Sequence, residues 1–366
     1  MPIVISMALV AAYGSHSCSG KSSMSKLDLA VTDYGPARGA AGLWASPDGR
    51  FLAAELIFVG EPRMSPVIKV IERSTGEVVA RARGNVVAGP DNSGEVAYVT
   101  AEDLTHPVLR STARPDLAIP LGPAGGDYAR WRGYRLGASR DRVVVLHEEG
   151  KSLTLELVSL APKVPPSVLA SRTLSNREIF RFAAAASPTD DVLFLSGETP
   201  GSAPEEAKGH VIAIDGNTLK ERWRTPWTPG HGFLDRLAVG VTGDGAIVAA
   251  YAPSGLMLVD ARSGGGASMV KFQGYDGVKL IGVPGRRALV ALRVFDRPVH
   301  SSEYNIEVIE LPAGAVTKLR PDTGPSNLPS IAVFGSTVLV APGTAPRWAN
   351  DPASWGPEVR GFVQQP

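Results

Sequence analysis

Hydrophobic residues along this chain come in short runs separated by tight turns. One unit recurs: an apolar run, a turn rich in Pro, Asp, Gly or Asn, and a second apolar run. Its clearest copy has apolar runs at residues 42–45 and 51–54 around the turn Ser46-Pro47-Asp48-Gly49-Arg50. Runs of this length are typical of buried strands and are too short for helices. The pattern therefore predicts an all-β protein.

The turn recurs at intervals of 41 to 54 residues, near residues 48, 91, 140, 190, 244, 285 and 335. A third apolar run often follows and leads through another turn to a fourth, as at residues 67–71, 210–215 and 256–260. Four strands per unit of about 40 to 50 residues are the sequence signature of a β-propeller. Seven turns predict seven four-stranded blades. Six or eight blades stay open, because the second unit is poorly patterned after residue 101.

The last unit extends only from about residue 321 to residue 366. Its outer strand could be supplied by the apolar-polar segment at residues 26–31, which would close the ring. We therefore expect one propeller domain over residues 26–366, preceded by an export leader and flexible linker over residues 1–25.

Composition agrees with a turn-rich fold that has a large core. The 366 residues include 40 glycines and 30 prolines, and 44% of the chain is hydrophobic. Lys and Arg number 37 against 36 Asp and Glu, which gives a net charge of +1. A nucleic-acid surface needs a clustered excess of basic residues, so this balance argues against a nucleic-acid partner.

The leader predicts export. Residues 3–12 form an apolar run that is too short to span a bilayer but fits the apolar region of a secretory signal, although no Lys or Arg precedes it. Cys18 is the only cysteine, so no internal disulfide can form. Its position after this run resembles a bacterial lipoprotein signal, with departures at Ser15 and His16. The resemblance implies a lipidated Cys18, possible membrane attachment, and a periplasmic, outer-membrane or secreted protein. The alternative is a free cysteine in a disordered leader.

The turns also resemble those of known propellers. The Ser-Pro-Asp-Gly-Arg turn is similar to turns of WD40-like and TolB-like propellers, and residues 209–223 resemble the YVTN and quinoprotein-type repeats. The match departs at Leu219, where those repeats have Gly. The resemblance implies a propeller but names no substrate. The vicinal cysteines of quinone-dependent propellers are missing, and no lactonase site residues can be matched, so we expect no cofactor.

Recognised catalytic motifs are absent from the sequence. His147-Glu148-Glu149 follows an apolar run and leads into Gly150, so we expect it in a turn between strands. The six histidines show no metal-ligand spacing. We therefore predict no catalytic residue and no metal site.

Propeller geometry suggests where a ligand would bind. The segments that lead into the innermost strands converge on one mouth of the central channel, and rigidly positioned loops commonly carry function. These segments are rich in Arg and aromatic residues, the types that are enriched at binding hot spots; Arg132 belongs to one of them. The predicted binding residues are Arg38, Arg130, Trp131, Arg181, His231 and Tyr275. Alternatively, Trp131 and Tyr275 pack between blades while the arginines bridge neighbouring loops.

The sequence thus favours a non-enzymatic exported propeller that binds a partner protein or a small ligand at a channel mouth. One alternative is a propeller enzyme, either a lactonase-like hydrolase or a quinone-type oxidoreductase. Another is a cytoplasmic scaffold. Fold alone does not decide among them, because propellers host many unrelated functions.

Overall fold

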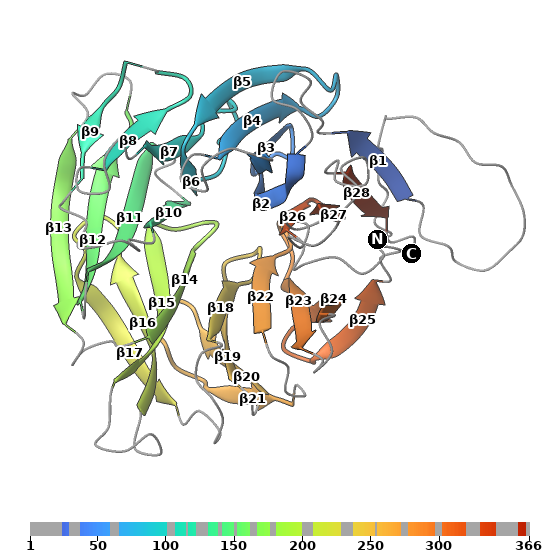
Figure 1. Cartoon of the computed structure of the whole chain (residues 1–366). Helices are drawn as coiled ribbons and strands as arrows, with labels where there is room; N and C mark the ends of the chain where they lie inside the picture. Colours follow the sequence, from blue (N-terminus) through green and yellow to red (C-terminus); the bar gives the residue numbers. More distant parts are fainter. Residues whose placement is uncertain are drawn as a thin grey trace, which may run out of the picture.

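A computed structural model places the chain in a ring of β-sheets (Figure 1). It describes residues 24–28, 37–58, 66–100, 107–114, 116–121, 131–137, 141–149, 152–161, 167–175, 181–199, 208–227, 237–252, 255–271, 277–296, 302–319, 330–341 and 358–363. Over these residues every regular element is a strand, and no helix long and apolar enough to cross a membrane is found among them.

The described strands form seven antiparallel sheets of four strands each, which we number as blades 1 to 7. Blades 1 to 3 are built from β2 (Ala37–Ala45), β3 (Phe51–Phe58), β4 (Val67–Glu72) and β5 (Val78–Arg83); β6 (Asn85–Ala88), β7 (Ala97–Thr100), β8 (Val108–Ser111) and β9 (Ile119–Pro120); and β10 (Trp131–Arg135), β11 (Arg142–Glu149), β12 (Ser152–Ser159) and β13 (Val168–Ser175). Blades 4 to 6 are built from β14 (Arg181–Ala186), β15 (Val192–Thr199), β16 (Lys208–Asp215) and β17 (Glu221–Trp227); β18 (Ala238–Val241), β19 (Ile247–Ala252), β20 (Gly255–Asp260) and β21 (Ser268–Val270); and β22 (Gly277–Gly282), β23 (Ala288–Asp296), β24 (Ser302–Glu310) and β25 (Ala315–Leu319). A β-propeller with four-stranded blades, as the repeats predict, is confirmed.

Blade 7 joins the two ends of the chain. It contains β26 (Ser330–Phe334), β27 (Thr337–Ala341) and β28 (Glu358–Val363), with β1 (Met24–Asp28) as its outer strand. β1 pairs antiparallel with β28, from Met24 opposite Phe362 to Asp28 opposite Glu358. An N-terminal strand therefore completes the last sheet of the ring, next to the C-terminal strand (Figure 1).

The turns between the first and second strands are held by their own side chains. In blade 1, Ser46 Oγ donates to Asp48 Oδ1 at 2.6 Å and accepts the amide N–H of Phe51 at 2.9 Å. In blade 5, Thr242 Oγ1 donates to Asp244 Oδ1 at 2.6 Å and accepts the Ile247 N–H at 3.0 Å. Ser/Thr and Asp side chains replace backbone partners in such turns. This chemistry explains why the turn recurs in the sequence.

Apolar residues of neighbouring blades pack together around the ring. Seven core clusters lie between successive blades, including one between blades 7 and 1. Each cluster combines residues from the facing sheets, such as Leu146 of blade 3 with Leu195 of blade 4. Burial of each such side chain stabilises the fold by ~1.5–3 kcal/mol. The ring is therefore held by sheet-to-sheet packing, and the innermost strands are left to enclose a central space.

The turns between third and fourth strands show what Leu219 does at the position where the similar repeats have Gly. The equivalent residues in blades 1 and 5, Gly76 and Gly264, have φ of +73° and +70°, and Leu219 has φ of +56°. Non-glycine residues rarely adopt this conformation. Leu219 is only 1% exposed and packs into the core between blades 3 and 4, so its burial offsets the strained backbone.

Candidate functional site

The innermost strands of all seven blades enclose a cavity of about 770 Å³ along the ring axis. Its walls consist mainly of small or aliphatic residues from β2, β6, β10, β14, β18, β22 and β26 (Figure 1). Three charged side chains line it within the described part of the chain: Glu55, Arg132 and Lys279. A concave, largely apolar cavity with a few polar groups is the usual form of a small-molecule site.

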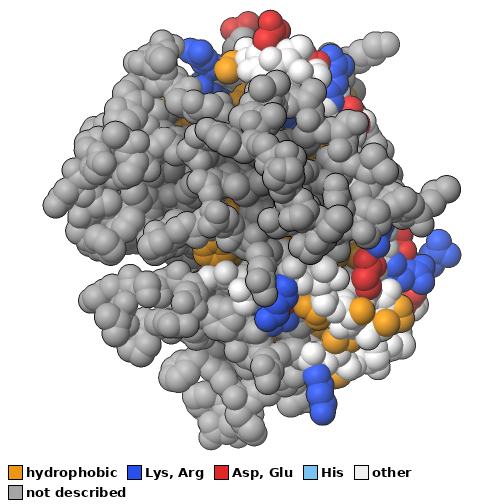
Figure 2. Space-filling model, turned by 90° about the vertical axis from the view of Figure 1, so that its right-hand side faces the viewer, with side chains coloured by type: hydrophobic (Ala, Val, Ile, Leu, Met, Phe, Trp, Pro, Cys, Tyr) orange, Lys and Arg blue, Asp and Glu red, His pale blue; other side chains and the backbone are white. Residues whose placement is uncertain are grey.

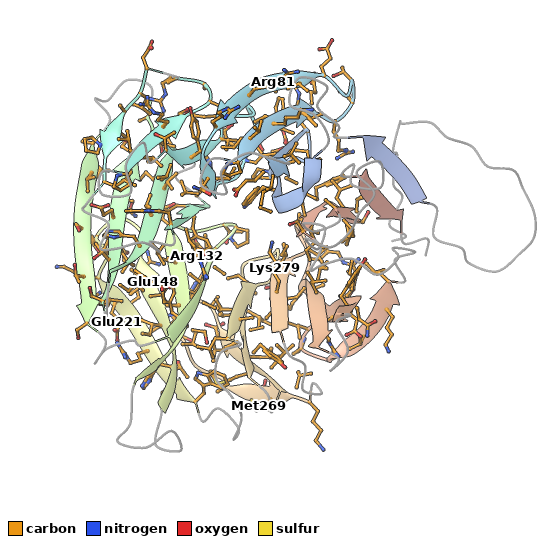
Figure 3. The ribbon with its side chains drawn as sticks, in the orientation of Figure 1. Arg81, Arg132, Glu148, Glu221, Met269 and Lys279 are labelled. Carbon is orange, nitrogen blue, oxygen red and sulfur yellow. The ribbon has the colours of Figure 1, made fainter. Side chains whose placement is uncertain are left out.

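Arg132 and Lys279 lie at one level of this channel. In blades 3 to 6, the amide N–H that closes the first turn belongs to Leu136, Ser187, Thr242 and Val283. The residues four positions earlier on the innermost strands are Arg132, Ala183, Ala238 and Lys279, and all four line the cavity. Ala183 and Ala238 lie on the strands between the two basic residues, and their small side chains leave space in the channel at this level. Figure 3 shows the two basic residues on strands at different sides of the central opening.

Arg132 is held in place by residues of the innermost strands around it. Its guanidinium carbon lies 5.8 Å from the ring centroid of Phe182 on β14, within cation–π range. It also forms a hydrogen bond with Tyr134, two residues further along β10. Burial raises the pKa of the Tyr134 phenol, and the nearby Arg132 charge and hydrogen bond oppose this rise. These contacts fix the guanidinium before any ligand arrives.

Lys279 is different, because no hydrogen bond or ion pair holds its ammonium group among the residues that the structure describes. Its side chain is exposed to the solvent of the channel, yet the surrounding strands enclose it. This enclosure lowers the pKa of Lys279. Figure 3 shows the side chain on β22, beside the central opening. Lys279 therefore presents a cation to the cavity without a protein anion to neutralise it.

Glu55 lines the cavity between blades 1 and 2. Its Oε2 accepts the amide N–H of Val86 at 2.9 Å, and the residue is 9% exposed. Burial raises the pKa of Glu55 to about 7, and the Val86 hydrogen bond opposes this rise. At neutral pH a substantial fraction of Glu55 is therefore uncharged, so it neutralises the two basic residues only in part.

Of the predicted binding residues, Trp131 is the one whose side chain the structure describes, and it lines the cavity. Its ring also stacks on the His147 imidazole, with 4.6 Å between the ring centroids, and packs into the core between blades 2 and 3. Trp131 thus belongs both to the channel wall and to the packing between blades. Arg38 and Arg181 lie on innermost strands β2 and β14, but their side chains fall outside the described part. Cys18, Arg130, His231 and Tyr275 lie outside the described residues.

The expectation that His147-Glu148-Glu149 forms a turn is wrong. These residues belong to β11, and His147 is 2% exposed. The strand continues because Trp131 covers the imidazole and Glu156 on β12 lies 3.7 Å from it, which gives a polar residue a place in the core. His147 is therefore a buried structural residue behind the channel wall.

Glu55 and Lys279 were not anticipated as site residues. Both interrupt apolar runs, at residues 53–57 on β3 and 278–281 on β22, where the strand would otherwise be hydrophobic. A lone charge inside an otherwise apolar strand is the signal that could have found them. Across the described ranges, no group of three or more His, Cys, Asp or Glu residues lies close enough to hold a metal ion.

Charged side chains outside the channel are of both signs. Figure 2 shows described Lys and Arg side chains beside Asp and Glu side chains and small hydrophobic groups. This mixture agrees with the net charge of +1. Arg132 and Lys279 differ from these surface charges because they line the channel.

No protein-family model and no curated protein matches this chain. Solved structures match it as a fold. The β-propeller domain of Cps50 (Swd1) from Myceliophteria thermophila aligns with a TM-score of 0.57 at 11% identity, covering 93% of this chain and 99% of that one. The β-propeller domain of the Trilobed protease from Pyrococcus furiosus aligns with a TM-score of 0.55 at 11% identity, covering 88% and 94%. The Dos1 propeller aligns with a TM-score of 0.51 at 13% identity, covering 88% of this chain and 78% of that one.

These similarities show the propeller fold alone, because identities of 11–13% carry no functional residues across. The Pyrococcus domain is described as having an open velcro topology. In the present chain, by contrast, β1 pairs with β28 and completes blade 7. Function must therefore be argued from the channel.

Proposed function

We propose that this propeller is a non-enzymatic binding module that holds a small ligand in its central channel. The observation that carries the proposal is Lys279, whose ammonium faces a cavity of about 770 Å³ without a partner in the described part of the chain. Enclosing a cation costs free energy unless channel solvent or a counter-charge compensates it. A ligand that supplies this compensation gives a physical reason for placing the charge there.

The size and walls of the channel support a small molecule as its occupant. Ligand cavities usually measure ~300–1,000 Å³ and combine apolar walls with a few polar groups. A partner protein is the other proposed occupant, and it would contact the channel mouth through Arg38, Arg130, Trp131, Arg181, His231 and Tyr275. The small ligand is favoured because the partnerless charge lies on the channel wall, on β22.

Native mass spectrometry tests this proposal. The full chain is incubated with the small-molecule fraction of an extract from its native host, desalted, and weighed intact. Ala184→Trp fills the channel, whereas Ala315→Trp adds the same group on the exposed outer strand β25. We expect retained mass in the wild type and in Ala315→Trp, and none in Ala184→Trp. Equal retention in all three proteins, or in none, would overturn the proposal.

A propeller hydrolase is a second candidate, and Glu55 favours it. A carboxyl with a pKa of about 7 in a ligand cavity has the property of a general acid or base near neutral pH. This candidate predicts hydrolysis of lactone or ester substrates that is lost in Glu55→Gln. Turnover that is unchanged in Glu55→Gln, or absent from the wild type with a broad substrate panel, would reject this role.

Export and lipid attachment are proposals that rest on the sequence of residues 1–23, which the structure does not describe. Membership of the WD40-like, YVTN or quinoprotein-type repeats is likewise proposed from the turn residues. The mass of the mature N-terminus from the native host tests export, since a chain that starts at a diacylated Cys18 is expected. An intact Met1 would instead support the cytoplasmic scaffold.

A further inference from the structure

We propose that the channel ligand is a small organic anion, with its negative group bound between Lys279 and Arg132 and its apolar body against the channel wall. This inference rests on the proposed binding function and deepens it by naming the class of ligand. It is carried by three features of the cavity: its balance of charge, the different contacts of its two cations, and the composition of its walls.

The first feature is an excess of positive charge. Arg132 and Lys279 line the cavity from blades 3 and 6, against the single carboxyl group of Glu55 in the described lining. Glu55 already accepts the Val86 N–H at 2.9 Å, and its burial favours the neutral acid. No carboxylate of the described chain pairs with Lys279. An anion is therefore the ligand that compensates the enclosed charge, whereas a cation would add to it.

The second feature is the way the two cations are held. Arg132 is fixed by Tyr134 and by the ring of Phe182, so a planar donor fork is available without loss of side-chain freedom. Such a fork matches the oxygen pair of a carboxylate, sulfonate or phosphate. Lys279 has a flexible stem and no partner in the described region, so its ammonium can adjust to the ligand. A rigid and an adjustable cation together suit one negative group on ligands of different shape.

The third feature is the apolar wall, which an inorganic ion would leave unused. The strand segment 183–186 of blade 4 consists of four alanines. Val239, Ile281 and Ala332 of blades 5, 6 and 7 also line the cavity, and Trp131 adds an aromatic surface. Removal of apolar surface from water contributes roughly 25 cal/mol per Å². The cavity therefore favours an anion that carries a hydrophobic body.

Calorimetric titration of the full chain with probes of one shape and three charges tests the inference. The probes are naphthalene-2-sulfonate, neutral 2-naphthol and 2-naphthylmethylammonium at pH 7, with inorganic phosphate as an anion that lacks a body. The variants are Lys279→Met and Arg132→Met. The matched control is Lys318→Met, which removes an exposed lysine from outer strand β25 of the same blade as Lys279. Thermal unfolding of each variant establishes that it is folded.

We expect the sulfonate to bind more tightly than either other naphthalene probe and than phosphate. Lys279→Met and Arg132→Met should each weaken sulfonate binding at least tenfold, while Lys318→Met should change it less than twofold. If Arg132→Met fails to fold, Lys279→Met alone decides. Equal binding of all three naphthalene probes, or sulfonate affinity unchanged in Lys279→Met, would overturn the anion inference.

The channel-filling variant Ala184→Trp separates failure of the anion inference from failure of the proposed binding function. If the three naphthalene probes bind equally and Ala184→Trp abolishes their binding, the channel is a ligand site but not one for anions. If the sulfonate binds equally to wild type, Lys279→Met and Ala184→Trp, its site is elsewhere and the anion inference fails. If no probe binds, the anion inference also fails, and retention in the native mass measurement still decides the proposed function independently. Phosphate binding as tight as that of the sulfonate would reject the apolar body.

Discussion

Two basic side chains of blade 6 meet opposite conditions. Arg293 on β23 is buried against blade 5, and its guanidinium nitrogen lies 2.7 Å from Glu307 Oε2 on β24, with side-chain exposures of 7% and 1%. Lys279 on β22 is enclosed by the channel, and the described chain offers its ammonium no carboxylate. One cation is neutralised within its own sheet, and the other faces an open cavity.

This difference separates a charge used for structure from a charge available for binding. A buried ion pair completes its own electrostatics, so nothing from outside is required. An enclosed cation without a counter-ion is compensated only by solvent or by a ligand. The comparison predicts that substitution of Arg293 will lower stability and that substitution of Lys279 will weaken ligand binding. Four tests at charged residues follow, in order of decreasing effect on stability.

The largest effect is expected from Arg293→Met. Removing the guanidinium leaves the Glu307 carboxylate buried without its partner at 2.7 Å. Breaking a buried pair from one side costs about 3–5 kcal/mol of unfolding free energy. Denaturant unfolding at pH 7 measures the loss, while binding of the sulfonate probe by the folded protein should stay within twofold.

The double variant Arg293→Met/Glu307→Leu is the control for this prediction. Replacing both charges with apolar groups should restore most of the lost stability, because neither buried charge is left unpaired. A double variant as unstable as Arg293→Met would show that packing of the two side chains, and not their charge, stabilises the interface between blades 5 and 6.

The next effect concerns Glu55, whose charge is neutralised in part by protonation. Its pKa is about 7 in the folded chain and near 4.5 when exposed, so the folded state holds this proton more tightly. The wild type should therefore lose stability as pH rises from about 4.5 to 7, by at most about 3 kcal/mol, and then level off. Glu55→Gln keeps an acceptor for the Val86 N–H and should lack this component.

Unfolding free energies measured from pH 4.5 to 8 test this sign. The difference between Glu55→Gln and wild type should grow in favour of the variant up to about pH 7 and then stay constant. A difference that does not change with pH would contradict the shifted pKa. A growing difference in favour of the wild type would indicate that the ionised carboxylate has a stabilising partner.

Sequence reasoning reached the propeller because its turns carry their own signal. The Ser46 and Asp48 side chains hold the first turn, and the same residue types recur where the chain must reverse in other blades. The site was harder to predict. Trp131 was found because it belongs to a segment rich in Arg and aromatic residues that the repeat pattern places at an innermost strand, but Glu55 and Lys279 are single charges within strands. Whether such a charge meets a partner or a cavity depends on the register of neighbouring blades, which local sequence does not encode.

Lys279→Met gives the third effect and is the counterpart of Arg293→Met. It removes a charge that no carboxylate of the described chain neutralises, so no buried anion is left behind. The unfolding free energy should therefore change by no more than about 1 kcal/mol, in the range of substitutions that break no network. Denaturant unfolding measures this change, and the same variant should lose sulfonate binding at least tenfold. A loss of stability as large as that of Arg293→Met would place Lys279 among the structural charges.

The smallest effect is expected at a third basic residue of blade 6, Arg287. Its Nε lies 2.8 Å from Asp244 Oδ2 of blade 5, nearly the separation of the Arg293–Glu307 pair, but the two side chains are 55% and 25% exposed. Solvent already stabilises both charges, and Asp244 keeps its bonds to Thr242 and to the Ala246 N–H. Arg287→Met should therefore cost less than about 1 kcal/mol, and less still in high salt. Unfolding at two salt concentrations checks this. A cost equal to that of Arg293→Met would show that separation and not burial decides the strength of these pairs, and the distinction between Arg293 and Lys279 would then lose its physical basis.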